Sequence, residues 1–373
     1  MKEGWEYKRL IDICDVYQPK TISTSKLVNN GSYYVYGANG IIGKYINFNH
    51  EESEVLLTCR GASCGNINVS KPKSWINGNA MVIHPLNEKI TKEYLSYYLK
   101  VIDYSKVITG AAQPQITRSS LSDTFILYPS IDEQRRIVSY LDSSFKLIDE
   151  IKEKAQKSLS EAKALFKSAL AEAMEPKEGW EEKTLGDVCI LIRGPFGGSL
   201  KKECFTREGY AVYEQQNAIY NQFTFRYFID EDKYNEMARF KVKAGDLIMS
   251  CSGTIGKVAI IPDNYQNGII NQALLKLTPL GILNSYFLKY LMESKIFLDK
   301  LLVYTEGVAI KNVASVSVLK GIQINIPNIP IQKRIVSHLD KLSSNVKQME
   351  EKYQKIVEEC DALKQAMLRD VFE

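Results

Sequence analysis

The sequence lacks the patterns that would assign this chain a catalytic or membrane role. None of its 11 prolines is adjacent to another, so no Asn-Pro-Pro or Asp-Pro-Pro methyltransferase loop is present, and no GxGxxG dinucleotide fingerprint occurs. There is no stretch of eighteen or more apolar residues, and the N-terminus MKEGWEYKRL lacks the apolar core of a signal peptide. We therefore expect a cytoplasmic, non-catalytic protein with no membrane contact.

Metal ligands are also scarce. The seven cysteines have no CxxC spacing, and the three histidines (His50, His84 and His338) are scattered along the chain. A zinc site needs about four such ligands brought together, so we expect no metal. An odd number of cysteines is typical of reduced thiols, which we expect to be small buried hydrophobic residues.

Charge of one sign is not abundant either, since 48 basic residues face 44 acidic ones. Residues 1–130 carry +3 and 176–328 carry +2, whereas 131–175 carry −1 and 329–373 carry no net charge. This distribution weakly favours a polyanionic partner for the two longer parts. Taken alone, so small an excess is more typical of an ordinary solvated surface.

What the chain does contain is a long internal repeat. KEGWE at residues 2–6 returns at 177–181, and PSIDEQRRIVSYLD at 129–142 is matched by PNIPIQKRIVSHLD at 327–340. A repeat of this length is a duplicated domain followed by a helix, too long for a solenoid unit. It predicts two similar readers of a partner that itself has two sites.

Each repeat ends in a predicted long helix, at about 132–174 and 330–372. Ala, Leu, Glu, Lys and Gln dominate both segments, and no Gly or Pro interrupts them. Apolar residues spaced alternately by three and four predict that the helices pack as a coiled coil. The packing candidates are Ile148, Ile151, Ala155, Ala162, Leu165, Leu342, Val346, Met349, Tyr353, Ile356 and Leu363.

The domain order follows from these segments. We expect recognition domains at 1–130 and 176–328, each followed by a long helix, at 131–175 and 329–373. A helix of about forty residues is roughly 60 Å long. If the duplicated parts pack through equivalent faces, the helices are antiparallel and related by a pseudo-two-fold axis, which suits the dyad symmetry of duplex DNA. The alternative is that each helix packs on its own globular domain.

Both globular parts mix strand and helix patterns, which predicts an α+β class. In the first part, 33–36 and 55–58 are predicted strands and 92–101 a helix; in the second, 246–250, 258–261 and 273–277 are strands and 285–293 a helix. Residues 20–60 and 193–245 do not align convincingly between the repeats. We expect the two globular parts to share their fold and to recognise different features of the partner.

Glycine-rich turns and amide side chains are the candidate binding elements. The turns 59–65 and 251–257 can bring backbone N–H groups and cations close to phosphate, although neither has Walker spacing and both could be plain structural turns. Amides in the loops 109–116 and 306–313 can pair with a base edge, or can stabilise the loops. The resulting candidates are Asn39, Lys44, Arg60, Ser63, Gln113, Gln115, Arg118, Arg193, Gln215, Gln216, Asn217, Ser252, Thr254, Lys257, Lys311 and Asn312.

The order of these motifs resembles the specificity subunits of type I restriction-modification enzymes. The resemblance is carried by Trp5 and Trp180 at the repeat openings, the turns at 61–65 and 253–257, FKVKAGDLIMS at 240–250, and the doubled helix openings QRRIV and QKRIV. It covers essentially the whole chain. No single motif is decisive, but their duplicated order is specific.

The resemblance implies two target-recognition domains that read the two halves of a bipartite, asymmetric DNA sequence, with a spacer set by the helices. It also implies two docked methyltransferase subunits that methylate adenine N6 with S-adenosylmethionine. Two translocase-nuclease subunits, where present, would consume ATP with Mg²⁺. This chain would bind no cofactor itself. The competing hypothesis is a coiled-coil adaptor that binds proteins and no DNA.

Overall fold

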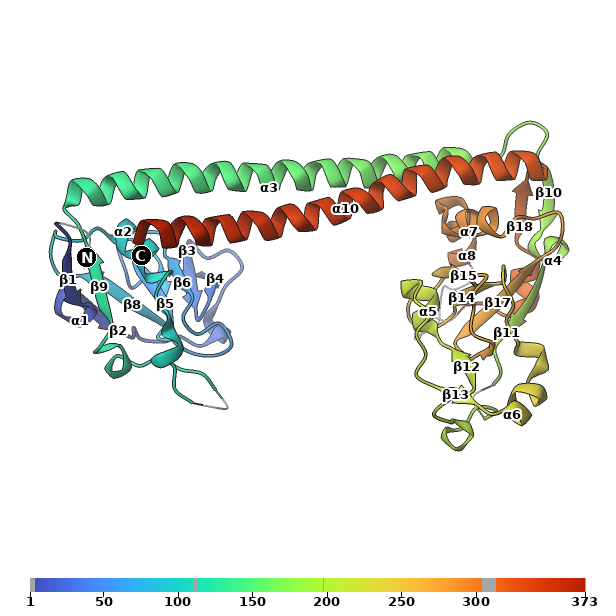
Figure 1. Ribbon diagram of the computed structural model, residues 1–373, viewed down its shortest axis with the longest axis horizontal. Coiled ribbons are helices and arrows are strands. Elements are labelled where there is room, and N and C mark those ends of the chain that lie inside the picture. Colours follow the sequence, from blue (N-terminus) through green and yellow to red (C-terminus); the bar gives the residue numbers. More distant parts are fainter. Residues whose placement is uncertain (1–3, 111–112, 197, 304–312, 373) are drawn as a thin grey trace. The chain divides into compact units, whose positions relative to one another are not determined.

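The computed structural model describes residues 4–110, 113–196, 198–303 and 313–372. Its internal contacts divide the chain into two compact units. Unit 1 comprises Met1–Gln156 together with Lys352–Glu373, and unit 2 comprises Lys157–Glu351. Each unit thus contains one globular part and one portion of each of the two long helices (Figure 1).

The larger sheet of unit 1 has four antiparallel strands in the order β2-β8-β5-β6. These strands are β2 (Cys14–Tyr17), β8 (Ala80–Pro85), β5 (Val55–Thr58) and β6 (Ile67–Val69). All four residues of β5 are buried, as expected for a strand inside a core of β-branched and leucine side chains. Helix α2 (Lys92–Leu99) packs against β5 and β6.

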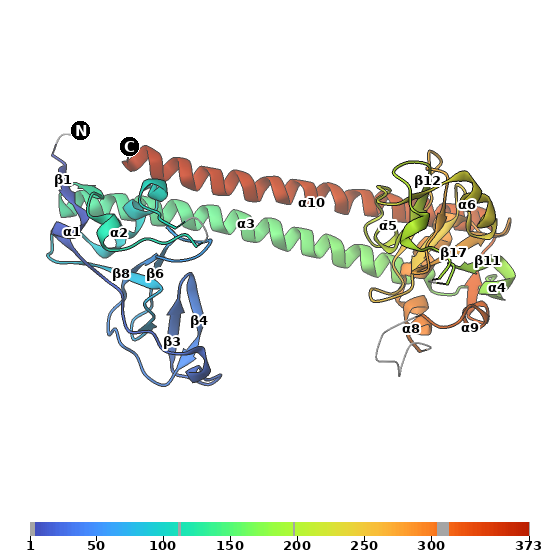
Figure 2. The same cartoon turned by 90° about the horizontal axis from the view of Figure 1, so that it is seen from below.

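Two smaller sheets complete unit 1. Strand β1 (Glu6–Arg9) pairs with β9 (Phe125–Tyr128) and so joins the N-terminal segment to the start of the long helix. The other sheet, called the outer sheet of unit 1, has the order β4-β3-β7, with β3 (Tyr33–Gly37) between β4 (Gly40–Tyr45) and β7 (Trp75–Ile76). Figure 2 shows β3 and β4 side by side. Strand β3 is antiparallel to β4 and parallel to β7.

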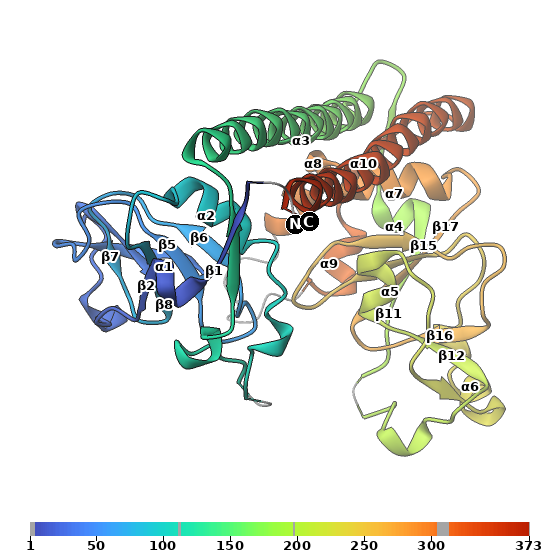
Figure 3. The same cartoon turned by 60° about the vertical axis from the view of Figure 1, so that its left-hand side comes forward.

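Unit 2 repeats this topology strand for strand. Its four-stranded sheet has the order β11-β17-β14-β15 and its outer sheet the order β13-β12-β16, in which β12 is again antiparallel to one neighbour and parallel to the other. Figure 3 shows β12 beside β16. The strands are β10 (Glu181–Thr184), β11 (Cys189–Arg193), β12 (Tyr210–Tyr213), β13 (Phe228–Ile229), β14 (Leu247–Ser250), β15 (Val258–Ile260), β16 (Gly268–Ile270), β17 (Leu274–Pro279) and β18 (Gln323–Ile326). The α+β prediction is confirmed.

The long helices are α3 (Ile131–Met174) and α10 (Ile329–Phe372). The shorter helices are α1 (Leu10–Ile13), α4 (Leu185–Val188), α5 (Gln215–Tyr220), α6 (Glu231–Glu236), α7 (Ser285–Glu293), α8 (Lys295–Val303) and α9 (Val316–Lys320). Short 3-10 turns occur at Thr24–Lys26, Tyr104–Lys106, Ser119–Leu121, Lys202–Cys204 and Ala238–Phe240. No helix in the described part of the chain combines the length and apolar character needed to cross a membrane.

Within each unit the two long helices run antiparallel. In unit 1, Lys152 pairs with Asp361 at 2.9 Å and Lys364 with Asp149 at 2.6 Å, so residue numbers rise along α10 in the direction in which they fall along α3. In unit 2, Lys163 pairs with Glu350 at 2.6 Å. These exposed ion pairs contribute less than about 1 kcal/mol each, so they set the register more than the stability.

Each globular part packs on both helices. The core of unit 1 takes Ile137 and Leu141 from the start of α3 and Leu368 and Phe372 from the end of α10. The core of unit 2 correspondingly takes Leu170 and Met174 from α3 and Val336 and Leu339 from α10. Helix pairing and helix-domain packing therefore occur together, although the sequence suggested them as alternatives.

The predicted packing face of the helices needs a correction at three positions. Ile151, Leu165 and Leu363 are 53%, 62% and 50% exposed. Their inward places are taken one residue later, by Lys152, Phe166 and Lys364, all less exposed. An i+3 and an i+4 neighbour flank the same helix face, and only the packing partner decides which one turns inward. The structure places the remaining candidates at buried or half-buried positions: Ile148, Ala155, Ala162, Leu342, Val346, Met349, Tyr353 and Ile356.

Candidate nucleic-acid interface

In unit 1 the glycine-rich turn after β5 lies against the segment at 113–116. The N–H of Gly61 donates to the carbonyl of Pro114 at 3.0 Å, and the N–H of Ile116 donates to the carbonyl of Cys59 at 3.0 Å. Gly61 and Gly65 have φ values of +87° and +98°, which side chains with a Cβ rarely adopt. The turn and the segment therefore form one braced loop cluster.

Five of the predicted residues lie in or beside this cluster. Arg60 is exposed and forms a β-bridge with Gln115, while Gln113 is exposed at the start of the described segment. Ser63 is half-buried inside the turn. Asn39 is exposed in the β3–β4 turn, where its Oδ1 accepts weak bonds from the side chains of Asn66 and Asn68, at 3.4 and 3.3 Å.

The other two candidates of unit 1 lie outside this cluster. Lys44 is exposed on β4, opposite Tyr34 in the strand register. Arg118 is exposed immediately before the 3-10 turn at Ser119–Leu121. Neither has an ion pair with any residue that the structure describes, so both can meet an external anion.

Unit 2 builds its loop cluster in the same way. The N–H of Val313 donates to the carbonyl of Cys251 at 3.0 Å, the counterpart of the Ile116–Cys59 bond. Gly253 and Gly256 have φ values of +66° and +77°. Ser252 is half-buried in this turn, while Thr254 and Lys257 are exposed. Lys311 and Asn312, predicted for the adjoining loop, lie outside the described residues.

Two of the amide candidates in unit 2 have roles inside the fold. Asn217 is 1% exposed; its Oδ1 accepts from the N–H of Glu214 at 2.7 Å and its Nδ2 donates to the carbonyls of Gln222 and Thr224. It caps α5 and holds the next loop, so its side chain has a role inside the fold, and its prediction as a base-contacting residue stays a prediction. The side chain of Gln215 donates to the carbonyl of Ser252 and ties α5 to the glycine turn. Gln216 is half-buried beside it.

Strand pairing reveals an equivalence that the sequence comparison missed. Strands β3 and β12 pair in parallel with β7 and β16 in the same register, so Tyr36 and Tyr213 occupy matching positions. Asn39 and Gln216, each three residues further on, are therefore equivalent in topology. The signal was the pattern Tyr-x-Val-Tyr at 33–36 and 210–213, which the surrounding divergence obscured.

Arg193 stands at the base of the cluster in unit 2. It is half-buried at the end of β11 and hydrogen-bonds the thiol of Cys251, whose pKa is raised to about 11 by burial. In unit 1 the corresponding contact is made by Gln18, which donates to the sulfur of Cys59 at 3.1 Å. Gln18 was not predicted. Its alignment with Arg193 in the first twenty residues of each repeat could have indicated it.

Phe196 is a second residue that the sequence reasoning did not select. It is 92% exposed, three residues beyond Arg193. Gly194 fixes the base of its loop, since its N–H donates to the carbonyl of Leu274 at 2.9 Å and a Cβ there would lie 1.8 Å from the carbonyl oxygen of Asn271. The turn Gly-Pro-Phe-Gly-Gly is the sequence signal, since glycine and proline mark a loop in which Phe has little to pack against.

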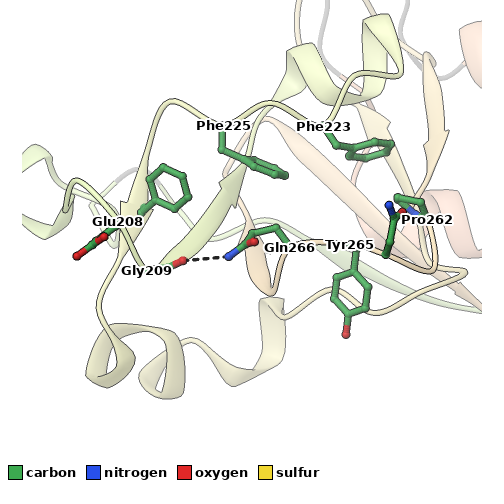
Figure 4. A pocket seen from close by; sticks show the side chains of 9 residues that line it. Glu208, Gly209, Phe223, Phe225, Pro262, Tyr265 and Gln266 are labelled. Carbon is green, nitrogen blue, oxygen red and sulfur yellow. Dashed lines mark hydrogen bonds between the residues drawn. The ribbon is translucent and has the colours of Figure 1, made fainter.

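A separate pocket of about 730 Å³ opens in unit 2 beside the outer sheet (Figure 4). Phe223, Phe225, Phe228 and Tyr265 supply its aromatic lining, and the Nε2 of Gln266 donates to the carbonyl of Gly209 at 3.2 Å across it. The lining contains no basic residue. It is therefore unsuited to a phosphate group and is distinct from the loop cluster.

Comparison with known proteins agrees with this geometry. A family model described as the type I restriction modification DNA specificity domain matches the chain twice, at residues 2–161 and 177–358. A Haemophilus influenzae protein provisionally named a type I restriction enzyme specificity subunit is 25% identical over 354 residues, which cover 91% of this chain and 88% of that protein. The EcoprrI type I specificity subunit of Escherichia coli is 26% identical over 121 residues, covering 32% of this chain and 30% of its own length.

Two solved structures share the fold. A chain from work on complex assembly and conformational transition of the type I R-M system has a TM-score of 0.77 at 19% identity, covering 100% of this chain and 98% of its own. The HsdS subunit from Thermoanaerobacter tengcongensis has a TM-score of 0.57 at 18% identity, covering 100% and 97%. With both repeats matched by the family model, the chain belongs to the type I restriction-modification DNA specificity family.

Proposed function

We propose that this chain is the non-catalytic DNA-specificity subunit of a type I restriction-modification complex, and that its two units read the two halves of a bipartite, asymmetric target. The observation that carries the proposal is the loop cluster built by the same backbone bonds in both units but with different side chains. Asn39 in unit 1 is matched by Gln216 in unit 2, and Arg60 by Ser252. Equal frames with unequal side chains suit two different half-sites.

In each loop cluster, different residues would contact the bases and the phosphates of the DNA. Exposed or half-buried amides such as Gln113 and Gln216 can donate and accept at once, which matches the N6 and N7 edge of adenine in the major groove. Arg60, Arg118 and Lys257 are exposed cations without an ion pair among the described residues, and they suit phosphates. Thus the amides would set the sequence and the cations the affinity.

The two long helices would set the spacer between the half-sites. Each has 44 residues, about 66 Å at 1.5 Å per residue. Their antiparallel pairing within each unit supports a stiff connection. A heptad inserted into both helices, after Lys157 and after Lys355, preserves the inward faces and is expected to lengthen the spacer of the recognised sequence.

Methyltransferase subunits would dock on surface residues that both repeats retain. Arg136 and Arg334 occupy the same position of the two repeats and both are exposed. The same holds for Ser139 and Ser337. Exposed identities contribute little to folding, so a shared partner explains their retention better than stability does. Two such partners would use S-adenosylmethionine to methylate adenine N6, and translocase-nuclease subunits with ATP and Mg²⁺ could join them.

The decisive experiment is co-expression with the adjacent methyltransferase gene, followed by long-read mapping of N6-methyladenine. We expect one bipartite motif methylated on both strands. Replacing Arg136 and Arg334 together by Glu should remove the methylation while the chain stays folded. A complex that assembles and binds DNA but methylates no motif would contradict the specificity role; assembly without any DNA retention would favour the protein-binding adaptor.

A further inference from the structure

Unit 1 carries a surface region with hardly any acidic residue. Residues 18–50 contain no Asp or Glu, and neither do residues 55–87. The three acids between these stretches are all engaged. Glu51 pairs with Lys73 at 3.3 Å, Glu52 with Lys92 at 2.9 Å, and Glu54 is 5% exposed between His84 and Lys92, at 2.8 and 3.2 Å. The remaining cations of this region are therefore not neutralised locally.

Two of these cations converge on one tyrosine of the outer sheet. The Nζ of Lys44, opposite Tyr34 on β4, lies 5.5 Å from the centre of the Tyr34 ring, and the Nζ of Lys71 lies 4.7 Å from it. The backbone of Lys71 is held by the Tyr36 hydroxyl, which accepts from its N–H at 3.0 Å, and by Ser74, whose hydroxyl donates to its carbonyl at 2.6 Å. The two ammonium groups thus lie within about 10 Å of each other.

Two exposed like charges about 10 Å apart repel by only about 0.4 kcal/mol in water, and the attraction of about 0.5–1 kcal/mol between each ammonium group and the ring offsets this, so the ring can hold both cations. Neither lysine forms an ion pair with a described residue, and both are exposed. A bound phosphate would gain from both unpaired charges. We call Tyr34, Lys44 and Lys71 the Tyr34 clamp.

The outer sheet of unit 2 also places cations on aromatic rings, but its two cations lie on different rings and one of them, Arg226, is neutralised by an acid. Arg226 lies 5.2 Å from the Tyr227 ring, yet it forms a bidentate pair with Glu214, at 3.0 and 2.9 Å. Lys241 lies 3.8 Å from the Tyr234 ring and donates to the side chain of Asn235 at 2.9 Å. Residues 194–245 contain eight basic and seven acidic residues. This surface is nearly neutral.

We propose that the Tyr34 clamp of unit 1 binds backbone phosphates of duplex DNA independently of sequence, and that unit 2 has no equivalent clamp on its outer sheet. This inference rests on the proposed DNA-binding function and adds a division of labour to it. Both units read bases, whereas unit 1 supplies the larger share of the salt-dependent affinity. The outer sheet of unit 1 would then hold the DNA while the loop clusters test its sequence.

The test measures the salt dependence of duplex binding by the chain in complex with its methyltransferase partner. For Lys44→Gln/Lys71→Gln we expect log K against log[salt] to lose about 1.8 of its slope, about 0.9 for each phosphate contact. Target and scrambled duplexes should weaken by the same factor, and the methylated motif should not change. The matched control is Lys241→Gln in unit 2, for which the slope should stay as in the wild type.

The outcomes separate this inference from the proposed function. If the wild-type complex binds duplex DNA but the double variant keeps its slope, or if Lys241→Gln lowers the slope per lysine as much, the clamp is wrong while the specificity role stands. If the double variant instead changes the methylated motif, Lys44 or Lys71 reads bases and the clamp is again wrong. If the wild-type complex binds no duplex at all, the proposed function fails and takes the clamp with it.

Discussion

The side-chain oxygen of Gln134 accepts a hydrogen bond from the backbone N–H of Thr91 at 2.9 Å. Thr91 is the N-cap of α2 and Gln134 lies in the first turn of α3, so this bond fastens the one helix to the other. The Nε2 of Gln134 donates to the carbonyls of Lys89 and Pro129. Gln332 makes the same three bonds in unit 2, to Asn284, Ile282 and Pro327.

Replacing Gln134 by Leu should destabilise unit 1 strongly. The residue is 0% exposed, so the buried carbonyl of Pro129 and the partly buried N–H of Thr91 and carbonyl of Lys89 would lose their partner. At about 1–3 kcal/mol for each unsatisfied group, partly relieved by local adjustment, we expect the free energy of unfolding to fall by about 2–4 kcal/mol. Urea unfolding measures it. The exposed neighbour change Arg136→Ala should cost less than about 0.5 kcal/mol, and equal effects would refute the role of the bonds.

Gly253→Ala should weaken DNA binding through the shape of the loop. A Cβ at this position meets no atom within 4 Å, but the φ of +66° is unfavourable for alanine by about 1–2 kcal/mol. Gly281→Ala is the control, since it also meets nothing within 4 Å and has no positive φ. The measurement is the affinity of both variants for duplex DNA. If Gly253→Ala binds like the wild type, the turn conformation is not needed for binding.

Gln216→Ala should change the recognised sequence and Asn217→Ala should lower stability, although the two residues are adjacent. Gln216 is half-buried and follows Gln215, whose side chain bonds the glycine turn, so its loss should relax base preference at one position, by about 1–3 kcal/mol of discrimination. Asn217 is buried and its side chain makes three hydrogen bonds, so its loss should lower stability. Mapping of the methylated motif and thermal unfolding distinguish them. An unchanged motif in the Gln216 variant would remove this residue from the reading set.

Alkaline pH should destabilise the chain through its buried thiols. Burial raises the pKa of Cys14 and of Cys189 from 9.0 to about 12, so the folded form keeps these thiols neutral while the unfolded chain ionises them above pH 9. Their stabilising contribution is therefore complete below pH 9 and is lost as the pH rises towards 12. Between pH 8 and pH 10 we expect a loss of about 1.4 kcal/mol for each thiol.

The measurement is the difference in unfolding free energy between pH 8 and pH 10. In Cys189→Ala this difference should shrink by about 1.4 kcal/mol whatever the variant costs at pH 8. Cys204→Ala, at a half-buried position, is the control. If both variants show the wild-type pH dependence, Cys189 does not titrate as its burial implies.

The sequence predicted best the elements whose signals are local. The absence of internal Gly and Pro placed the long helices within a residue or two of α3 and α10, and β5 and α7 lie at the residues expected for them. The seam of the helices was predicted only in part, because Ile151 and Lys152 flank the same face and the choice between them belongs to the partner helix.

In the candidate site, too, the sequence predicted the features with local signals and missed those that depend on tertiary contacts. The glycine turns at 59–65 and 251–257 were recognisable because positive φ restricts those positions to few residue types. Asn217 could not be told from Gln216, since an amide that caps a helix and an amide that faces solvent have the same side-chain chemistry. Tyr34, Lys44 and Lys71 become a cluster only when β3, β4 and the chain after β6 are brought together.

By itself the sequence determined that the chain is duplicated, that each copy is α+β with a long helix, and which turns must contain glycine, because repeats, helix propensity and backbone sterics act over short stretches. The tertiary structure alone decided that Asn39 corresponds to Gln216, that each core includes the end of the other copy's helix, and which cations remain unpaired. These outcomes depend on strand register and side-chain contacts between residues far apart in the chain, which no local pattern encodes.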